Sequence, residues 1–211
     1  LRTADGIVSI EANDRIYLSE KRNKYTDEEL NTLFDSAIQQ GRVFIHAHLG
    51  ATDIDEIFSK LRYIIVGCEC DWVVVDHLHM LVNVLTEGDE RRGIDMLMNR
   101  LRSLVEETGV GMILVSHLRR AQGDRGHEKG IQVSLSHLKG SQGIAQLSDC
   151  VIALERNQQA ENPDEANITK VRVLKSRYTG DTGMACSLRY DIETGRLHEI
   201  SEEETFDNTN F

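Results

Sequence analysis

The sequence predicts an α/β fold with a mostly parallel β-sheet that is flanked by helices and extended at one edge by antiparallel strands. Two short apolar runs, residues 72–75 and 112–115, have the pattern of buried parallel strands. Between them, residues 89–108 carry apolar side chains at helical spacing. Three later strand-like runs have no long helix between them and predict the antiparallel extension: residues 150–154, 168–174 and 184–190.

Other segments fit around this sheet. Thr26 opens a capping box before a helical pattern that ends near Gly41, and residues 42–48 follow as a strand. Further patterns predict a helix over residues 54–67, a long loop over 118–133, a short helix over 141–147 and a turn over 191–196. We expect one domain over residues 1–198 and a disordered acidic tail over residues 199–211.

The composition limits the classes of protein that fit. The 211 residues carry 24 Lys and Arg against 35 Asp and Glu, a net charge of −11, so any nucleic-acid site must be local. The four cysteines lack a CxxC or disulfide-framework spacing, which favours reduced thiols in the cytoplasm. No signal peptide or membrane-length apolar run occurs, so we expect no membrane partner. The start at Leu1 suggests a fragment, a processed chain or an engineered one.

Polar residues follow both predicted parallel strands, where ligands bind in open α/β sheets. Asp76 comes directly after Val73-Val74-Val75, the Walker B pattern, in which a carboxylate holds Mg²⁺ beside nucleotide phosphates. His117 follows the second strand, where a polar side chain can contact a γ-phosphate. A single strand ending in aspartate, or a histidine that caps a strand, fits many folds. The two strands together favour a nucleotide site.

Two basic segments are candidates for phosphate contacts. The loop after His117 places Arg119, Arg120, Arg125 and Lys129 among glycines, which suits contact with a nucleic-acid backbone, although a solvated surface loop also fits. Arg177 follows a predicted strand, where a guanidinium can act on a neighbouring subunit's γ-phosphate as an arginine finger. A Lys-x-Arg segment on an ordinary surface is the alternative interpretation.

Four segments together resemble a known family: CDWVVVDHLHMLV (70–82), ILVSHLRR (113–120), LKGSQGIAQLSDCVIALERNQQ (138–159) and VLKSRYTGDTG (173–183). They are similar to the helicase domain of the primase-helicases of short-tailed phages, a group that includes mitochondrial Twinkle and, more distantly, the DnaB-type helicases. The resemblance implies a RecA-like P-loop NTPase core. It also implies a hexameric, NTP-dependent 5′→3′ replicative helicase that translocates on single-stranded DNA and unwinds duplex at the phage fork. The implied cofactors are Mg²⁺ with ATP or dTTP, and the implied location is the cytoplasm of the bacterial host.

The resemblance also implies roles for individual residues. Asp76 would be the Walker B carboxylate, His117 the γ-phosphate sensor, Gln146 the link between DNA and nucleotide, and Arg177 the arginine finger with Lys175 nearby. Arg156 and Tyr190 would flank the nucleotide base. The implied DNA contacts are Arg119, Arg120, Arg125, Lys129, Lys139 and Gly140. Gly123 stands at a position that is basic in the family, and Arg120 is an extra basic residue of this chain.

The end of the chain and one missing motif complete these expectations. The acidic tail ends in Phe211, and related phage helicases end in an acidic tail whose terminal aromatic residue docks on the replicative DNA polymerase. A solubilising tail is the alternative. No G-x-x-x-x-G-K-[ST] motif is present, so the phosphate-binding loop and the catalytic glutamate are expected upstream, and this chain alone is expected to be inactive. A non-catalytic protein that binds single-stranded DNA or regulates a helicase is the main alternative. The TGDTG segment disfavours a recombinase of the same fold.

Overall fold

The computed structural model describes residues 28, 44, 53–82, 90–119, 126–140, 142–191 and 196–201. The chain divides into two compact units, one of Leu1–Gly50 with Tyr190–His198 and the other of Ala51–Arg189 with Glu199–Phe211. The second unit holds almost all of the described elements. Of the predicted helix at 26–41 and strand at 42–48, only Glu28, which is helical, and Phe44 are described, and the tail beyond Ser201 lies outside the described residues.

Strands β1 (Trp72–Val75) and β2 (Gly111–Leu114) form a parallel pair. Their register places Trp72 opposite Gly111 and Val75 opposite Leu114. Both strands were predicted, and β2 is shifted by one residue toward the N-terminus. The backbone pairing continues one step past β2, because the N–H of Val115 donates to the Val75 carbonyl at 2.9 Å.

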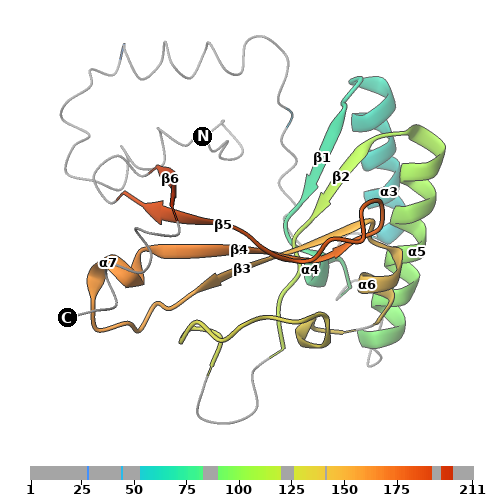
Figure 1. Cartoon of the computed structure of the whole chain (residues 1–211). Helices are drawn as coiled ribbons and strands as arrows, with labels where there is room; N and C mark the ends of the chain where they lie inside the picture. Colours follow the sequence, from blue (N-terminus) through green and yellow to red (C-terminus); the bar gives the residue numbers. More distant parts are fainter. Residues whose placement is uncertain are drawn as a thin grey trace. The chain divides into compact units, whose positions relative to one another are not determined.

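Two long helices lie beside this strand pair (Figure 1). Helix α3 (Ile54–Arg62) begins at Asp53, whose side chain accepts the N–H of Asp55 at 3.1 Å. It continues into a π-helical turn, η2 (Tyr63–Gly67), as the helical pattern up to Gly67 predicted. Helix α5 (Glu90–Thr108) confirms the helix predicted over residues 89–108.

The core forms where α5 meets a short helix, α4 (Leu78–Val82), that directly follows the end of β1. Helix α5 buries one stripe of side chains, Ile94, Leu97, Met98, Leu101 and Leu104. Leu78 and Val82 of α4 are 0% and 1% exposed and belong to the same cluster as most of that stripe. Burial of each such side chain stabilises the fold by about 1.5–3 kcal/mol. The sequence patterns did not predict α4.

The opposite face of the strand pair is apolar and exposed. Trp72 and Val74 of β1 are 67% and 63% exposed, and Ile113 of β2 is 51% exposed. Parallel sheets are normally covered on both faces. The helices that the structure describes cover only the face that carries Val73 and Val75.

A second sheet is antiparallel, with the strand order β3-β4-β5-β6. Its strands are β3 (Cys150–Arg156), β4 (Ile168–Ser176), β5 (Gly183–Tyr190) and β6 (Leu197–Ile200). The first three confirm the predicted runs. The α/β class is confirmed, and among the described strands the antiparallel part is larger than an edge extension, with four strands against two.

Two short helices frame β3. Helix α6 (Gln142–Leu147) lies within the predicted short helix, and α7 (Pro163–Ala166) starts at Asn162, whose side chain accepts the N–H of Asp164. The predicted turn at 191–196 is bracketed by a backbone hydrogen bond, in which the N–H of Asp191 donates to the Arg196 carbonyl at 2.8 Å. Among the described helices, none combines the length and apolar character that crossing a membrane requires.

Candidate functional site

The ends of β1 and β2 bring Asp76 and His117 to one edge of the sheet. Beyond the strands, the N–H of Leu78 donates to the Val115 carbonyl at 2.9 Å, which holds the two outgoing segments together. The side chain of Asp76 is exposed, and so is that of His117. The carboxylate and the imidazole therefore both face solvent at the carboxyl ends of parallel strands, where nucleotides bind in this class of sheet.

Three histidines gather at this edge. One ring nitrogen from each of His77, His79 and His117 lies within 4.8 Å of the other two. The rings of His77 and His117 have centroids 4.0 Å apart, and those of His79 and His117 are stacked at 5.3 Å. His79 is only 4% exposed, and its Nε2 lies 3.2 Å from the Lys139 carbonyl. Burial lowers the pKa of His79.

The chain after β2 runs antiparallel to residues 137–139. The N–H of Arg119 donates to the His137 carbonyl at 2.8 Å, and the N–H of Lys139 donates to the His117 carbonyl at 3.0 Å. Leu118 and Leu138 form the bridge between these bonds. We call residues 117–119 and 137–139 the sensor ladder. It joins the sensor candidate His117 directly to the DNA candidates Arg119 and Lys139.

The predicted DNA residues of the sensor ladder already have partners in the chain. The guanidinium of Arg119 donates to the carbonyls of Leu138 at 3.0 Å and Gly140 at 3.3 Å. Lys139 forms an ion pair with Glu90 at 2.7 Å, and this hydrogen bond lowers the pKa of Glu90. The sequence led us to expect only a charge for DNA contact from Arg119. Its side chain also holds the backbone of residues 138–140 in place.

Gly140 is required by its surroundings. Its φ is +111°, and a Cβ built on it would lie 2.0 Å from Cδ1 of Ile94 on α5. Lys129 lies in the turn over residues 126–130 and forms an isolated antiparallel β-bridge with Asn157, the residue after β3. Arg120 and Arg125 lie outside the described residues.

A cluster of charged side chains surrounds the C-terminal end of α6. The ammonium of Lys175, on β4, donates to the carbonyls of Ala145 at 2.6 Å and Ser148 at 2.8 Å. Arg177 donates to the Asp149 carboxylate and the Gln146 carbonyl, both at 2.9 Å. Cations suit this position, because a helix leaves unpaired carbonyls at its C-terminus. The structure therefore brings Lys175 and Arg177 together around the backbone of Gln146.

The predicted base-flanking residues end strands β3 and β5 of the antiparallel sheet, which are separated by β4. Arg156 is the last residue of β3, and its guanidinium donates to the Ala166 carbonyl at 2.6 Å and to the Asn167 side chain at 3.1 Å. Tyr190 is the last residue of β5. The contacts of Arg156 fix its side chain against the end of α7.

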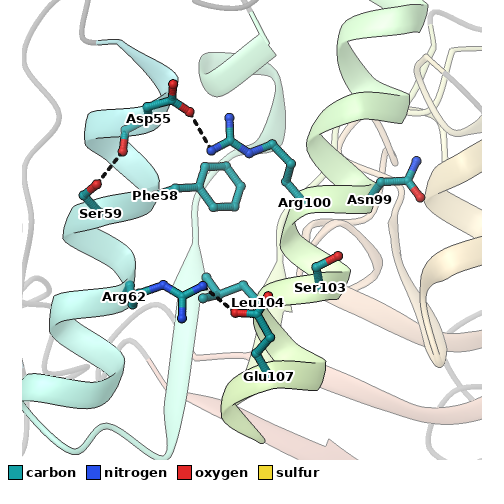
Figure 2. A pocket seen from close by; sticks show the side chains of 9 residues that line it. All are labelled: Asp55, Phe58, Ser59, Arg62, Asn99, Arg100, Ser103, Leu104 and Glu107. Atoms are coloured by element: carbon teal, nitrogen blue, oxygen red, sulfur yellow. Dashed lines mark hydrogen bonds and ion pairs between the residues drawn. The ribbon is translucent and has the colours of Figure 1, made fainter.

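A cavity of about 440 Å³ lies between α3 and α5 and shares no residue with the strand-end group (Figure 2). Its polar side chains pair with one another: Arg100 binds Asp55 at 2.7 Å and lies over the Phe58 ring, and Arg62 binds Glu107. These pairs occupy the charged groups of the cavity, so we place the functional site at the strand ends.

The sequence did not predict that the three histidines form one group, or that residues 117–119 pair with residues 137–139. The sequence signal for the histidine group was the His-x-His spacing of residues 77 and 79. This spacing indicates a site only once His117 is known to lie beside it. The signal for the second was weak, because residues 118–133 are polar and carry no strand pattern.

A parallel strand pair with a long helix between its strands, followed by Asp76 and His117, defines a protein of the α/β class. Comparison with known proteins identifies the family. Residues 7–199 match the DnaB-like helicase C terminal domain, and the chain belongs to this family.

Individual relatives agree with the family. The chain is 38% identical over 175 residues to the DNA helicase/primase of Enterobacteria phage T3, a match that covers 83% of this chain and 30% of that protein. It is 22% identical over 178 residues to a probable plasmid replicative DNA helicase of Chlamydia psittaci, covering 84% of this chain and 38% of that protein. The chain thus spans roughly a third of the length of these relatives.

Solved structures confirm the fold. A solved ATPase domain matches with a TM-score of 0.62 at 23% identity, covering 87% of this chain and 64% of that one. A DnaB-like replicative helicase, described with its primase interactions, matches with a TM-score of 0.59 at 20% identity, covering 87% of this chain and 45% of that one. The RecA-like fold that the sequence motifs implied is therefore shown.

Proposed function

We propose that this chain is part of the motor of an NTP-dependent replicative DNA helicase that moves 5′→3′ on single-stranded DNA and unwinds duplex at a phage replication fork. The observation that carries the proposal is the backbone bond between Lys139 and the carbonyl of His117. It links the position expected to sense the γ-phosphate to the segment expected to grip DNA. A shift of His117 upon hydrolysis would move Lys139 with it.

The nucleotide roles follow from the placement of each group. Asp76 would hold Mg²⁺, which suits its exposed carboxylate because this ion prefers oxygen ligands. When bound, Mg²⁺ neutralises charge on the phosphates of ATP or dTTP. Arg156 and Tyr190 would hold the base, and Gln146 would relay contact with DNA.

Arg177 would act on the nucleotide of a neighbouring subunit in a ring of six. Its side chain is 44% exposed, so one side of the guanidinium stays open to a neighbour while Asp149 and Gln146 orient the other. Lys175 would set the same region by binding the end of α6. Planar guanidinium groups suit this role because they spread charge over the transferring oxygens.

Single-stranded DNA would bind along the sensor ladder and its neighbouring turn. The proposed contacts are Arg119, Arg120, Arg125, Lys129, Lys139 and Gly140. The acidic tail that ends in Phe211 would dock on the replicative DNA polymerase in the host cytoplasm. The net charge of −11 requires the DNA site to be local, and a short basic ladder meets that need.

The test uses the longer protein that carries this chain. Asp76→Asn, His117→Ala and Arg177→Ala should each lower DNA-stimulated NTP hydrolysis and unwinding. The loss for Arg177→Ala should be about 1,000-fold or more, the effect of an arginine finger. Arg100→Ala is the matched control for Arg177→Ala, because Arg100 also pairs with an aspartate at the surface but belongs to the α3–α5 cavity. DNA binding without hydrolysis in the unaltered protein would favour the non-catalytic alternative.

A further inference from the structure

The three histidines at the strand ends have the chemistry of a metal site. They come from two elements, since His77 and His79 follow β1 and His117 follows β2. One ring nitrogen of each lies within 4.8 Å of the others. Tetrahedral zinc with Zn–N bonds of about 2.0–2.1 Å places its ligand nitrogens about 3.4 Å apart. The exposed His117 side chain has room to rotate and shorten its distances to the other two nitrogens.

The hydrogen bond of His79 fixes which nitrogen remains for a ligand. A carbonyl can only accept, so Nε2 of His79 carries the proton that it donates to the Lys139 carbonyl. Nδ1 then carries the lone pair. Metal-binding histidines show this arrangement, with the second nitrogen held by a carbonyl or carboxylate.

The unused nitrogens are buried. Among the residues that the structure describes, Nδ1 of His79 and Nδ1 of His77 are shielded from solvent and have no hydrogen-bond partner. A buried polar atom without a partner is unfavourable, and coordination to a cation would satisfy it.

We propose that His77, His79 and His117 form a binding site for a divalent transition metal of the Zn²⁺ class. Three imidazoles select zinc, copper or nickel over magnesium, which prefers oxygen. The site therefore differs from the Mg²⁺ position expected at Asp76. A water molecule would take the fourth position, as in zinc sites with three protein ligands.

The site would control turnover, a consequence that rests on the proposed function. Coordination would hold His117 away from the γ-phosphate and would fix the sensor ladder through its carbonyl bond to Lys139. Micromolar Zn²⁺ should then inhibit Mg²⁺-dependent NTP hydrolysis by the longer protein. Removal of the ligand His79 should relieve that inhibition.

Direct binding is measured on the full 211-residue chain without nucleotide. Zn²⁺ is titrated in competition with a chromophoric chelator, and excess Mg²⁺ should not compete. His79→Gln and His77→Gln should each weaken Zn²⁺ binding by at least about tenfold, because each removes one of three ligands. His198→Gln is the matched control, since His198 is exposed on β6 and should leave binding unchanged.

Cobalt distinguishes the histidine site from the cysteines. Co²⁺ bound by imidazoles gives visible bands without the sulfur-to-metal charge transfer that Cys68 or Cys70 would produce. Charge-transfer bands, or Zn²⁺ binding equal in the unaltered chain and both histidine variants, would overturn the proposal. Thermal melts of the metal-free variants check folding, and His77→Gln decides the matter if buried His79 cannot be replaced.

The outcomes separate the two proposals. Zn²⁺ binding that depends on His77 and His79, in a longer protein without NTP hydrolysis, would keep the metal site and overturn the motor. Hydrolysis and unwinding that Zn²⁺ does not affect, together with no histidine-dependent binding, would do the reverse.

Discussion

The carboxylate of Glu155 and the guanidinium of Arg172 meet across β3 and β4 in a two-pronged ion pair, with N–O distances of 2.8 and 3.2 Å. The Glu155 side chain is 3% exposed and also accepts the N–H of Val133 at 2.8 Å. Glu155 therefore anchors the segment around Val133, which precedes residues 137–139 of the sensor ladder, to the antiparallel sheet. Its position inside the LERNQQ segment reflects folding rather than chemistry on a nucleotide.

Removing the partner of Glu155 should unfold the chain more readily. Arg172→Ala leaves a buried carboxylate without its cation, which costs about 3–5 kcal/mol of stability. Chemical denaturation of the full chain measures this loss. Lys60→Ala breaks the exposed Lys60–Glu56 pair and should cost less than about 1 kcal/mol. Equal effects of the two substitutions would contradict the structural role of Glu155.

The Glu90–Lys139 ion pair should weaken DNA binding. Glu90→Gln removes the competing carboxylate, so the affinity for single-stranded DNA should rise. Lys139→Ala should lower it and reduce the slope of log affinity against log salt by about 0.7, the value for one single-strand phosphate contact. Fluorescence anisotropy over a salt series measures both. An unchanged slope in Lys139→Ala would remove Lys139 from the DNA site.

The same pair should give a small acid-dependent change in stability. Lys139 lowers the pKa of Glu90 in the folded chain, so the stabilisation is fully present above the pKa of Glu90 in the unfolded chain. It is lost as the pH falls through the lower, folded pKa. The effect should be small because the Glu90 side chain is 46% exposed. Denaturation midpoints of the unaltered chain and Glu90→Gln should converge at acid pH, and a constant difference would argue against the pair.

Gly140→Ala should disturb both stability and DNA binding. The added Cβ would meet Ile94 Cδ1 at 2.0 Å in a backbone with φ of +111°. Gly180→Ala is the control, because Gly180 has φ of +76° but nothing within 4 Å of a Cβ. The control should lose about 1 kcal/mol from backbone strain alone. Gly140→Ala should lose more, as measured by denaturation, and a loss no larger than the control's would show that Ile94 yields easily.

Local patterns predicted the elements, whereas the site needed contacts between distant segments. Runs such as Trp72–Val75 predict strands because the apolar pattern of a strand lies within a few consecutive residues. Helix α4 was not predicted because it has only five residues and His79 interrupts its apolar pattern. The histidine group joins positions 77, 79 and 117 through the β1–β2 pairing. Position 117 is too far from positions 77 and 79 in the sequence for a local pattern to reveal this contact.

The most direct test of the motor proposal mixes two inactive forms of the longer protein. Asp76→Asn subunits lack the metal carboxylate and retain Arg177, whereas Arg177→Ala subunits retain Asp76. If Arg177 acts on a neighbour, random mixed rings contain intact sites at about one interface in four, because head-to-tail interfaces pair unlike surfaces. The account predicts that mixing restores DNA-stimulated NTP hydrolysis well above either variant alone. Activity that stays at the level of the separate variants, in rings shown to exchange subunits, would contradict it.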